Sequence, residues 1–246
     1  MRFDVITLFP EIISQTFSFG VTGRALERGL IELYTWNPRD YTSNPSRRVD
    51  AKPYSGGPGM VMQVDPLMRA IEAAKRDSSQ PTHVVYMSAQ GSPLNQTKIR
   101  ELLALPKIIL LSGRYEGIDQ RAINNGVDEE ISIGDFIVSG GELPSLIVID
   151  SITRLIPGVL GDEDSKRVES FEGGLLEYPQ YTRPENSDYG KVPKVLLSGD
   201  PKAIERWKLK QSLSKTLKNR PDLISIRELS TFEKELLNEI KDEETN

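Results

Sequence analysis

Short apolar runs rich in β-branched residues alternate along the first 160 residues with segments of helical spacing. Such runs are typical of strands buried on both faces of a sheet, and the spacing between them is typical of amphipathic helices. We predict strands at 2–8, 31–36, 83–88 and 107–112, and helices at 10–18, 65–77, 94–104, 118–124 and 142–155. This alternation indicates an α/β fold with a largely parallel sheet.

The pattern changes after Pro157. Residues 161–169 contain one apolar side chain, that of Val168, among polar, charged and glycine positions, which favours a linker. Segment 199–246 has helical patterning with few strand signals. We therefore expect a first domain over 1–160, a flexible linker over 161–170 that is not ordered without RNA, and a small helical domain over 171–246.

Composition narrows the chemistry that is open to the chain. Its 246 residues include no Cys and one His, which excludes a thiolate nucleophile, a Cys-ligated zinc site and a multi-His metal site within one chain. His83 begins an apolar strand, so we expect it to be structural. No apolar run reaches the roughly 18 residues that span a membrane, and no signal-peptide pattern is present. We expect a soluble protein of the reducing cytoplasm, without a membrane partner.

Three glycine-rich segments stand out, at 54–60, 112–117 and 133–144. Glycine lets the backbone approach a ligand closely, and α/β proteins bind ligands at the carboxyl ends of their strands. None of the three is a Walker A or dinucleotide fingerprint. The segments therefore predict a ligand site of another kind, or else they are tight turns of a compact domain.

Charged residues gather in the same regions. Carboxylates occur near the glycine-rich segments and in the linker, at Glu116, Asp119, Asp135, Glu142, Asp162, Glu163, Asp164 and Glu169. They are candidates for acid–base chemistry, and the alternative is a solvated surface. Arg114 and Arg154 could be their ion-pair partners.

A basic segment lies near the carboxyl terminus. Residues 201–220 carry seven cations and one anion, a net charge of +6 in a chain whose total is −5, and they include Trp207. A basic helix with an aromatic residue is typical of a surface that binds a phosphate backbone. A basic face that balances the acidic tail at 239–244 is the alternative, but the segregation of charge favours RNA or DNA.

Taken in order, the motifs resemble those of the TrmD family, the bacterial tRNA (guanine-N1)-methyltransferases that modify the guanosine just 3′ of the anticodon. The motifs are ITLFPE at 6–11, FGVTGRA at 19–25, WNPRD at 36–40, GGPGM at 56–60, GRYEGID at 113–119, IGDFIVSGGELP at 133–144, RLIPGVLG at 154–161, ESF at 169–171, YPQYTRP at 178–184, PKVLLSGD at 193–200 and RWKLKQSL at 206–213. They cover nearly the whole chain.

The resemblance implies a SPOUT fold whose parallel sheet carries a trefoil knot, followed by a small helical domain. It implies a homodimer, S-adenosylmethionine bound in the knot, and a tRNA gripped by the helical domain. The family also implies magnesium, which no ligand cluster in the sequence reveals.

Carried onto this sequence, the resemblance implies cofactor contacts from three loops and from Pro58, which would close over the site with Gly59. The cofactor residues are Tyr86, Met87, Ser88, Gln90, Ser112, Gly113, Arg114, Tyr115, Glu116, Gly117, Ile133, Gly134, Asp135, Phe136, Ile137, Val138, Ser139, Gly140, Gly141 and Pro144. Among them, Gly113 and the backbone of 133–138 would contact adenine and ribose. The tRNA-binding residues are Lys202, Arg206, Lys208, Lys210, Lys215 and Lys218.

The reaction needs few groups from the protein. The methyl group of a sulfonium is already activated, so no covalent nucleophile is needed. Guanine N1 becomes nucleophilic once a carboxylate accepts its proton, and a cation near O6 stabilises the resulting charge. Glu169 stands where the family has Asp, so we expect it to be the base, with Asp164 as the alternative. Arg154 matches the family arginine at O6.

Other departures from the family lie in one loop, where Ser46, Ala51 and Ser55 replace His, Asp and Gly. Two competing interpretations remain from the sequence. One is another SPOUT methyltransferase that acts on a different RNA base or on ribose, and the other is a catalytically inactive tRNA-binding homologue.

Overall fold

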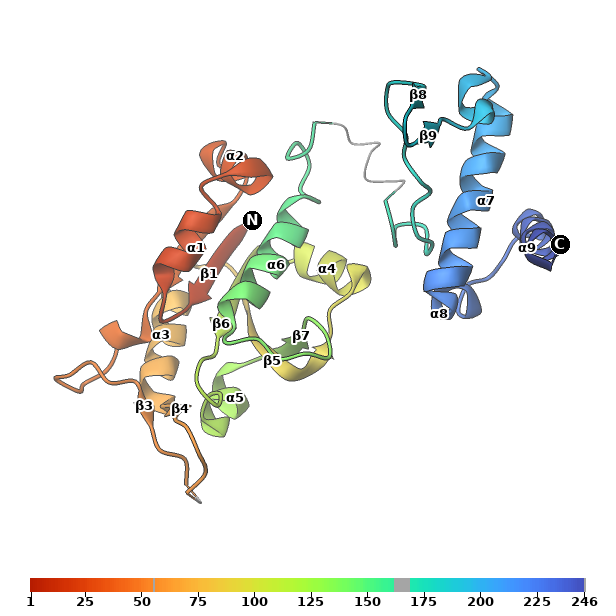
Figure 1. Ribbon diagram of the computed structural model, residues 1–246. Helices are drawn as coiled ribbons and strands as arrows, with labels where there is room; N and C mark the ends of the chain where they lie inside the picture. Colours follow the sequence, from red (N-terminus) through yellow and green to blue (C-terminus); the bar gives the residue numbers. More distant parts are fainter. Residues whose placement is uncertain (55, 162–168, 246) are drawn as a thin grey trace. The chain divides into compact units, whose positions relative to one another are not determined.

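The computed structural model describes residues 1–54, 56–161 and 169–245 (Figure 1). The chain divides into two compact units, Met1–Gly161 and Asp162–Asn246. Most of the predicted linker, including Asp164, lies outside the described residues, as does Ser55. The expected flexibility of the linker therefore stays a prediction.

The first unit is built on one parallel sheet with strand order β2-β1-β6-β5-β7. Its strands are β1 (Arg2–Ile6), β2 (Glu32–Trp36), β5 (Thr82–Pro93), β6 (Lys107–Ser112) and β7 (Glu129–Ser132). Its helices are α1 (Pro10–Thr16), α2 (Gly20–Glu27), α3 (Val64–Arg76), α4 (Gln96–Leu103), α5 (Gln120–Gly126) and α6 (Glu142–Thr153). A 3-10 helix at Pro38–Asp40 and a small ladder of β3 (Asp50–Ala51) with β4 (Val61–Met62) complete it. The predicted α/β fold with a parallel sheet is confirmed.

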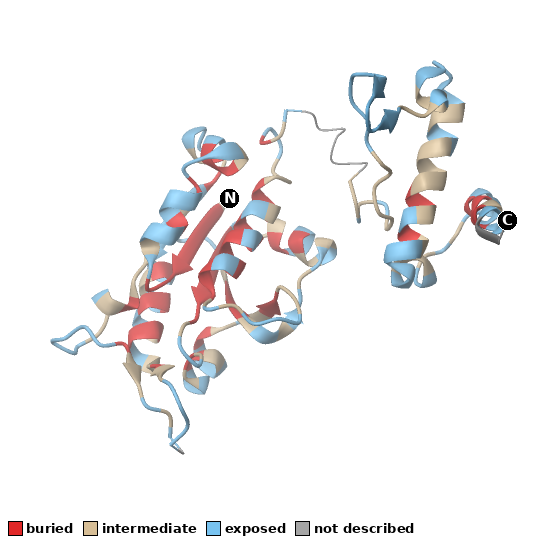
Figure 2. Ribbon diagram, viewed as in Figure 1, coloured by how far each residue is buried: buried red, intermediate tan, exposed pale blue. Residues whose placement is uncertain are grey.

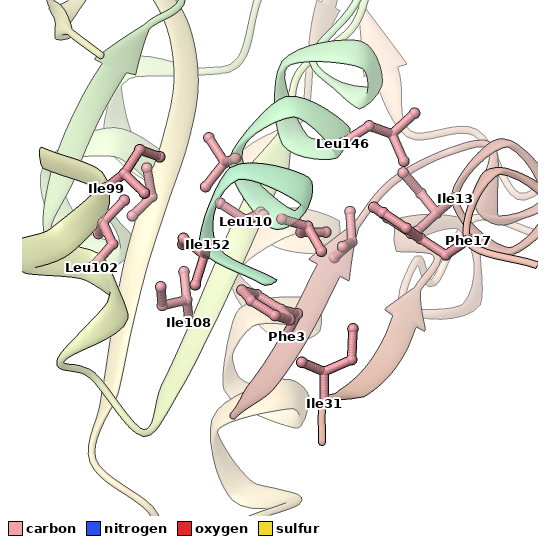
Figure 3. Packing of buried hydrophobic residues seen from close by; sticks show 14 of the residues in the cluster. Phe3, Ile13, Phe17, Ile31, Ile99, Leu102, Ile108, Leu110, Leu146 and Ile152 are labelled. Carbon is pink, nitrogen blue, oxygen red and sulfur yellow. The ribbon is translucent and has the colours of Figure 1, made fainter. Parts of the chain in front are cut away.

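Hydrophobic cores fill both faces of the sheet, because successive side chains of a strand point to opposite faces (Figure 2). Ile108 and Leu110 of β6 pack toward α1, α2, α4 and α6, where Phe3 and Ile152 also lie (Figure 3). Ile109 and Leu111 pack toward α3 and α5 on the other face. Burial of each such side chain stabilises the fold by about 1.5–3 kcal/mol. The strands that carry the ligand-site loops are therefore fixed from both sides.

Capping residues set where two of the predicted helices begin. Asn95 caps α4 by accepting a hydrogen bond from Lys98 N, and Asp119 caps α5 by accepting one from Arg121 N. A cap residue satisfies a backbone N–H that has no partner within the helix. Both helices consequently begin two residues later than predicted.

Apart from the 3-10 helix and the short β3–β4 ladder, helix α2 and strand β7 of the first unit were not predicted. Helix α2 contains two glycines, which lower helix propensity. A Cβ on Gly23 would lie 2.9 Å from the carbonyl carbon of Ser18, so close packing with α1's end explains that glycine. Strand β7 begins with two glutamates, and its acidic composition hides it from a search for apolar runs.

The second unit contains α7 (Pro201–Asn219), α8 (Pro221–Ser225), α9 (Thr231–Thr245), a 3-10 helix at Lys194–Leu197, and a small ladder of β8 (Asn186–Ser187) with β9 (Gly190–Lys191). Asp200 caps α7 by accepting hydrogen bonds from Lys202 N and Ala203 N, and Pro201 occupies the first helical position. Leu213 of α7 packs against Leu236, Leu237 and Ile240 of α9.

Candidate functional site

Loops that follow three neighbouring strands enclose a cavity of about 300 Å³ in the first unit. Residues 88–90 belong to the irregular part of β5, 113–117 follow β6, and 133–141 follow β7. The carboxyl ends of parallel strands meet at one edge of a sheet, where α/β proteins bind their ligands. The cavity is therefore the candidate ligand site of this unit.

The two glycines before α6 permit the close packing of these loops. A Cβ on Gly141 would lie 2.6 Å from Ser112 Cα and 2.8 Å from Gly113 N, both backbone atoms that cannot move aside. A Cβ on Gly140 would lie 2.4 Å from Nε of Arg114. Side chains at these positions would separate the loop after β7 from the loop after β6, so the cavity depends on glycine here.

Behind the loops, a buried polar network fixes their relative positions. The Glu142 carboxylate is 1% exposed and accepts a hydrogen bond of 2.8 Å from the Thr7 hydroxyl at the end of β1. Its other oxygen lies 2.8 Å from Nε of Arg114. Arg114 also donates to the Ser139 carbonyl and lies over the ring of Phe9. Arg114 thus connects both cavity loops with β1.

The segment 56–60 attaches to the loop after β6. Glu116 N donates to the Met60 carbonyl at 2.9 Å, and Met62 N donates to the Gly117 carbonyl at 3.0 Å. A Cβ on Gly59 would lie 2.5 Å from Cγ of Glu116, so the glycine backbone packs directly on that side chain. The exposed Pro58 precedes this contact.

Most of the predicted cofactor residues line the cavity. Those in the lining are Tyr86, Met87, Ser88, Gln90, Gly113, Arg114, Tyr115, Glu116, Gly117, Ile133, Gly134, Phe136, Ile137, Val138, Ser139, Gly140, Gly141 and Pro144. Ser112 lies outside the lining, since it is buried beneath Gly141 with its hydroxyl 2.9 Å from that of Ser145. Asp135 and Pro58 are also outside it. Contact with a cofactor stays a prediction for all of these residues.

The sequence did not indicate several other lining residues, including Ile118, Gln120, Ile123 and Glu130. Glu130 belongs to the unpredicted strand β7, where it is opposite Tyr86 in the register. Burial raises the pKa of the Tyr86 hydroxyl, and the nearby charge of Glu130 raises it further. A prediction of β7 would have revealed Glu130 as a residue of the site.

His83 belongs to a cluster of polar contacts outside the cavity. Its Nε2 is 3.0 Å from Oε1 of Glu129, whose second oxygen is 3.2 Å from Nζ of Lys98. The cavity lining does not include His83. This arrangement agrees with the structural role expected from the sequence.

The two residues expected at the target base occupy different units. Arg154 is the C-cap residue of α6 in the first unit. Glu169 lies in the second unit, where its carbonyl accepts a hydrogen bond from Glu172 N. Asp164, the alternative base, is outside the described residues. The catalytic roles of Arg154 and Glu169 stay predictions.

The basic segment forms helix α7, and its cations differ in their surroundings. Arg206 pairs with Glu239 of α9 at 2.5 Å, and Lys210 pairs with Glu239 and Glu243 at 3.3 and 2.7 Å. Lys208 instead lies 4.6 Å above the ring of Tyr178. Within the described chain, no acid pairs with the exposed Lys202, Lys215 and Lys218.

An aromatic pair adjoins the same helix. The rings of Tyr181 and Trp207 lie 6.3 Å apart and tilted. Positions 207, 208, 211, 215 and 218 fall on one face of an α-helix, away from the buried Leu213. This face, which we call the aromatic–basic face, combines Trp207, Lys208, Lys215 and Lys218 with Tyr178 and Tyr181. Such a combination is typical of surfaces that bind RNA.

Neither a metal-binding cluster nor a helix able to cross a membrane occurs among the described residues. They contain no group of three or more His, Asp or Glu side chains arranged to hold a metal ion. None of their helices combines the length and apolar character that crossing a membrane requires.

Comparison with known proteins gives a consistent result. The family model of "tRNA (Guanine-1)-methyltransferase TrmD" matches residues 1–226. A relative from Halorhodospira halophila is 53% identical over 97% of this chain and 90% of its own length. Relatives from Methylococcus capsulatus and Shewanella sediminis are 52% and 53% identical, covering 99% and 97% of this chain and 97% and 99% of their own lengths. All three are named tRNA (guanine-N(1)-)-methyltransferase.

Proposed function

The chain belongs to the TrmD family of tRNA (guanine-1)-methyltransferases, and we propose that it transfers a methyl group from S-adenosylmethionine to N1 of guanosine 37 in tRNA. The observation that carries this proposal is the family match over residues 1–226, supported by relatives of that name at 52–53% identity over nearly the full chain. The enzyme is therefore a methyltransferase that acts on RNA.

The cavity fits the methyl donor in its chemistry. Its backbone-rich walls, kept open by Gly113, Gly140 and Gly141, offer N–H and C=O groups to an adenine and a ribose. Glu116 and Glu130 add negative charge that suits a sulfonium cation. When bound, S-adenosylmethionine supplies an activated methyl group. Gly113, the 133–138 backbone and Gly140–Gly141 would hold it.

The protein's own residues contribute to the reaction by removing the N1 proton of the target guanine. Glu169 accepts the N1 proton of the target guanine, which makes N1 nucleophilic. Arg154 stabilises the negative charge that shifts to O6. Glutamate has the same carboxylate and a similar reference pKa to the aspartate of the family, so the substitution preserves the chemistry. Glu169→Gln would abolish most turnover while leaving tRNA affinity unchanged, and full turnover in that variant would reassign the base to Asp164.

The aromatic–basic face of α7 binds the tRNA. Lys215 and Lys218 are exposed cations of this face, and the aromatic residues beside Lys208 offer surfaces for stacking. Lys202, also exposed, adds positive charge near the start of the helix. Arg206 and Lys210 contribute less, because α9 already neutralises them.

A homodimer would cover an exposed apolar surface of the first unit. Leu143 and Ile147 of α6 are 53% and 45% exposed, and Phe19 before α2 is 77% exposed. Phe19 and Ile147 line one groove together with Phe17 and Leu146. Large apolar side chains gathered in this way mark association surfaces more often than free surface.

Further features follow from family membership. We propose that the chain has the trefoil knot, a catalytic domain over 1–160 and a helical domain over 171–246. We also propose that it is located in the cytoplasm and requires magnesium. Each is an expectation for this chain, to be tested separately from the reaction.

Transfer of labelled methyl groups tests the proposed function. The enzyme should methylate unmodified tRNA that carries guanosine 37, and the label should be lost when position 37 is adenosine. Binding of tRNA without any transfer would instead favour an inactive tRNA-binding protein.

A further inference from the structure

Two acidic residues, Glu116 and Glu130, belong to the cavity lining, and neither carboxylate forms an ion pair or side-chain hydrogen bond with another described residue. The cation in the described lining is Arg114, and its charge is balanced by the buried Glu142 behind the loops. The cavity consequently carries a net negative charge. Glu116 belongs to a motif that the family already implicates, whereas neither the motifs nor the comparisons give Glu130 a role.

Glu130 and its neighbour Glu129 occupy consecutive positions in β7, so their side chains leave the strand on opposite faces. Glu129 is paired with His83 and Lys98, outside the cavity. Glu130 lies in the cavity lining opposite Tyr86. The charge of Glu130 contributes to the raised pKa of the Tyr86 hydroxyl, after burial, which agrees with the position of Glu130 opposite that residue.

We propose that Glu130 is a specificity-determining residue that makes the cavity prefer the cationic methyl donor over its neutral demethylated product. This inference rests on the proposed function. Donor and product differ by one methyl group and one positive charge, because loss of the methyl converts a sulfonium into a thioether. A carboxylate in a partly buried cavity attracts the positively charged sulfonium of the donor but not the neutral thioether of the product. The attraction ends when the methyl group leaves, which favours release of the product.

Equilibrium binding to the full-length protein without RNA tests this inference. The dissociation constants of S-adenosylmethionine and S-adenosylhomocysteine are measured by calorimetry for the wild type, Glu130→Gln and Glu129→Gln. We expect Glu130→Gln to weaken donor binding about fivefold and product binding less than twofold, from the loss of one charge at this range. Glu129→Gln should leave the ratio of the two constants unchanged, although it removes the same charge one residue away.

A cationic analogue sharpens the comparison. In the amine analogue of the donor, an ammonium replaces the sulfonium, so its affinity should fall with that of the donor in Glu130→Gln. Equal weakening of donor and product in Glu130→Gln would overturn the proposal, since Glu130 would then act on the shape of the cavity alone. Unchanged affinities would overturn it as well. A wild type that binds neither compound would contradict the proposed function itself.

Discussion

Nε of Arg114 lies 2.8 Å from a carboxylate oxygen of Glu142 that is shielded from solvent. The two atoms are in ion-pair contact without forming an aligned hydrogen bond. Arg114 belongs to the loop after β6, and Glu142 begins α6 after the loop from β7. The pair therefore joins the two loops that form the donor cavity.

Removal of the Glu142 carboxylate should destabilise the protein. Glu142→Ala leaves the Thr7 hydroxyl and the Arg114 guanidinium without this partner, and we expect the free energy of unfolding to fall by about 2–4 kcal/mol. Denaturant melts measure the change. Glu72→Ala is the control, because it removes an exposed pair with Arg76 and should cost no more than about 0.5 kcal/mol. Equal effects of the two variants would refute the role given to Glu142.

A methyl group at position 141 should damage the donor site. The Cβ of Gly141→Ala would meet the backbone of Ser112 and Gly113 at 2.6–2.8 Å, forcing the two loops apart. We expect affinity for S-adenosylmethionine to fall about tenfold or more, as typical overpacking costs predict. Gly173→Ala is the matched control, since a Cβ there meets no atom within 4 Å. Wild-type donor affinity in Gly141→Ala would show that the loops are not held as described.

The two sides of α7 should differ in their effect on tRNA. Lys215→Ala removes an exposed cation, so we expect affinity to fall about threefold and the dependence on salt to weaken by roughly one counterion. Arg206→Ala should change the tRNA affinity and its salt dependence less, because Glu239 already neutralises the charge of Arg206. Filter binding across a salt series gives both quantities. The reverse order of effects would place the RNA on the α9 side of the helix.

The second unit should lose stability in acid through Glu233. Burial alone would raise the pKa of this carboxyl, but hydrogen bonds from Ser230 and Arg227 outweigh it and hold the pKa below its ordinary value of 4.5. The unfolded chain therefore binds the proton more tightly than the folded one. The stabilisation is complete well above pH 4.5 and is lost as the pH falls through the lower folded pKa.

Comparison with Glu233→Gln isolates this effect. Glutamine does not titrate, so the stability advantage of the wild type over the variant should shrink as the pH falls below about 4.5. Urea melts at pH 7, 5 and 3.5 measure it. An advantage that stays constant across this range would mean that Glu233 does not titrate with folding.

The sheet could be predicted where strands are apolar throughout. KIILLS at 107–112 is buried along its whole length, and the predicted and observed bounds of β6 agree. Strand β7 could not be found in this way, because EEIS places one glutamate toward His83 and Lys98 and the next beside the cavity. Its place in the sheet depends on pairing with β5, which is a long-range contact.

The positive charge of α7 could also be predicted from the sequence, but not which of its cations are paired with acidic residues. Residues 201–220 are basic by composition, yet Arg206 and Lys210 face acids that are about 30 residues further along the chain. Arg206 and Lys210 are thus neutralised by α9, whereas Lys208, Lys215 and Lys218 have no such ion pair among the described residues. The sequence predicts that the glycines at 140 and 141 belong to a loop. It does not predict the contacts of that loop with Ser112, Gly113 and Arg114, because these depend on the folded structure.

The identity of the methylated nucleoside decides whether this enzyme acts on N1 of guanosine 37. Unmodified tRNA with guanosine 37 is incubated with the enzyme and S-adenosylmethionine, then digested to nucleosides and separated by chromatography with mass detection. We predict 1-methylguanosine as the product. A methyl group on a ribose 2′-oxygen or on another base would rule out methylation at N1 of guanosine 37 and assign the chain to a different RNA methylation reaction.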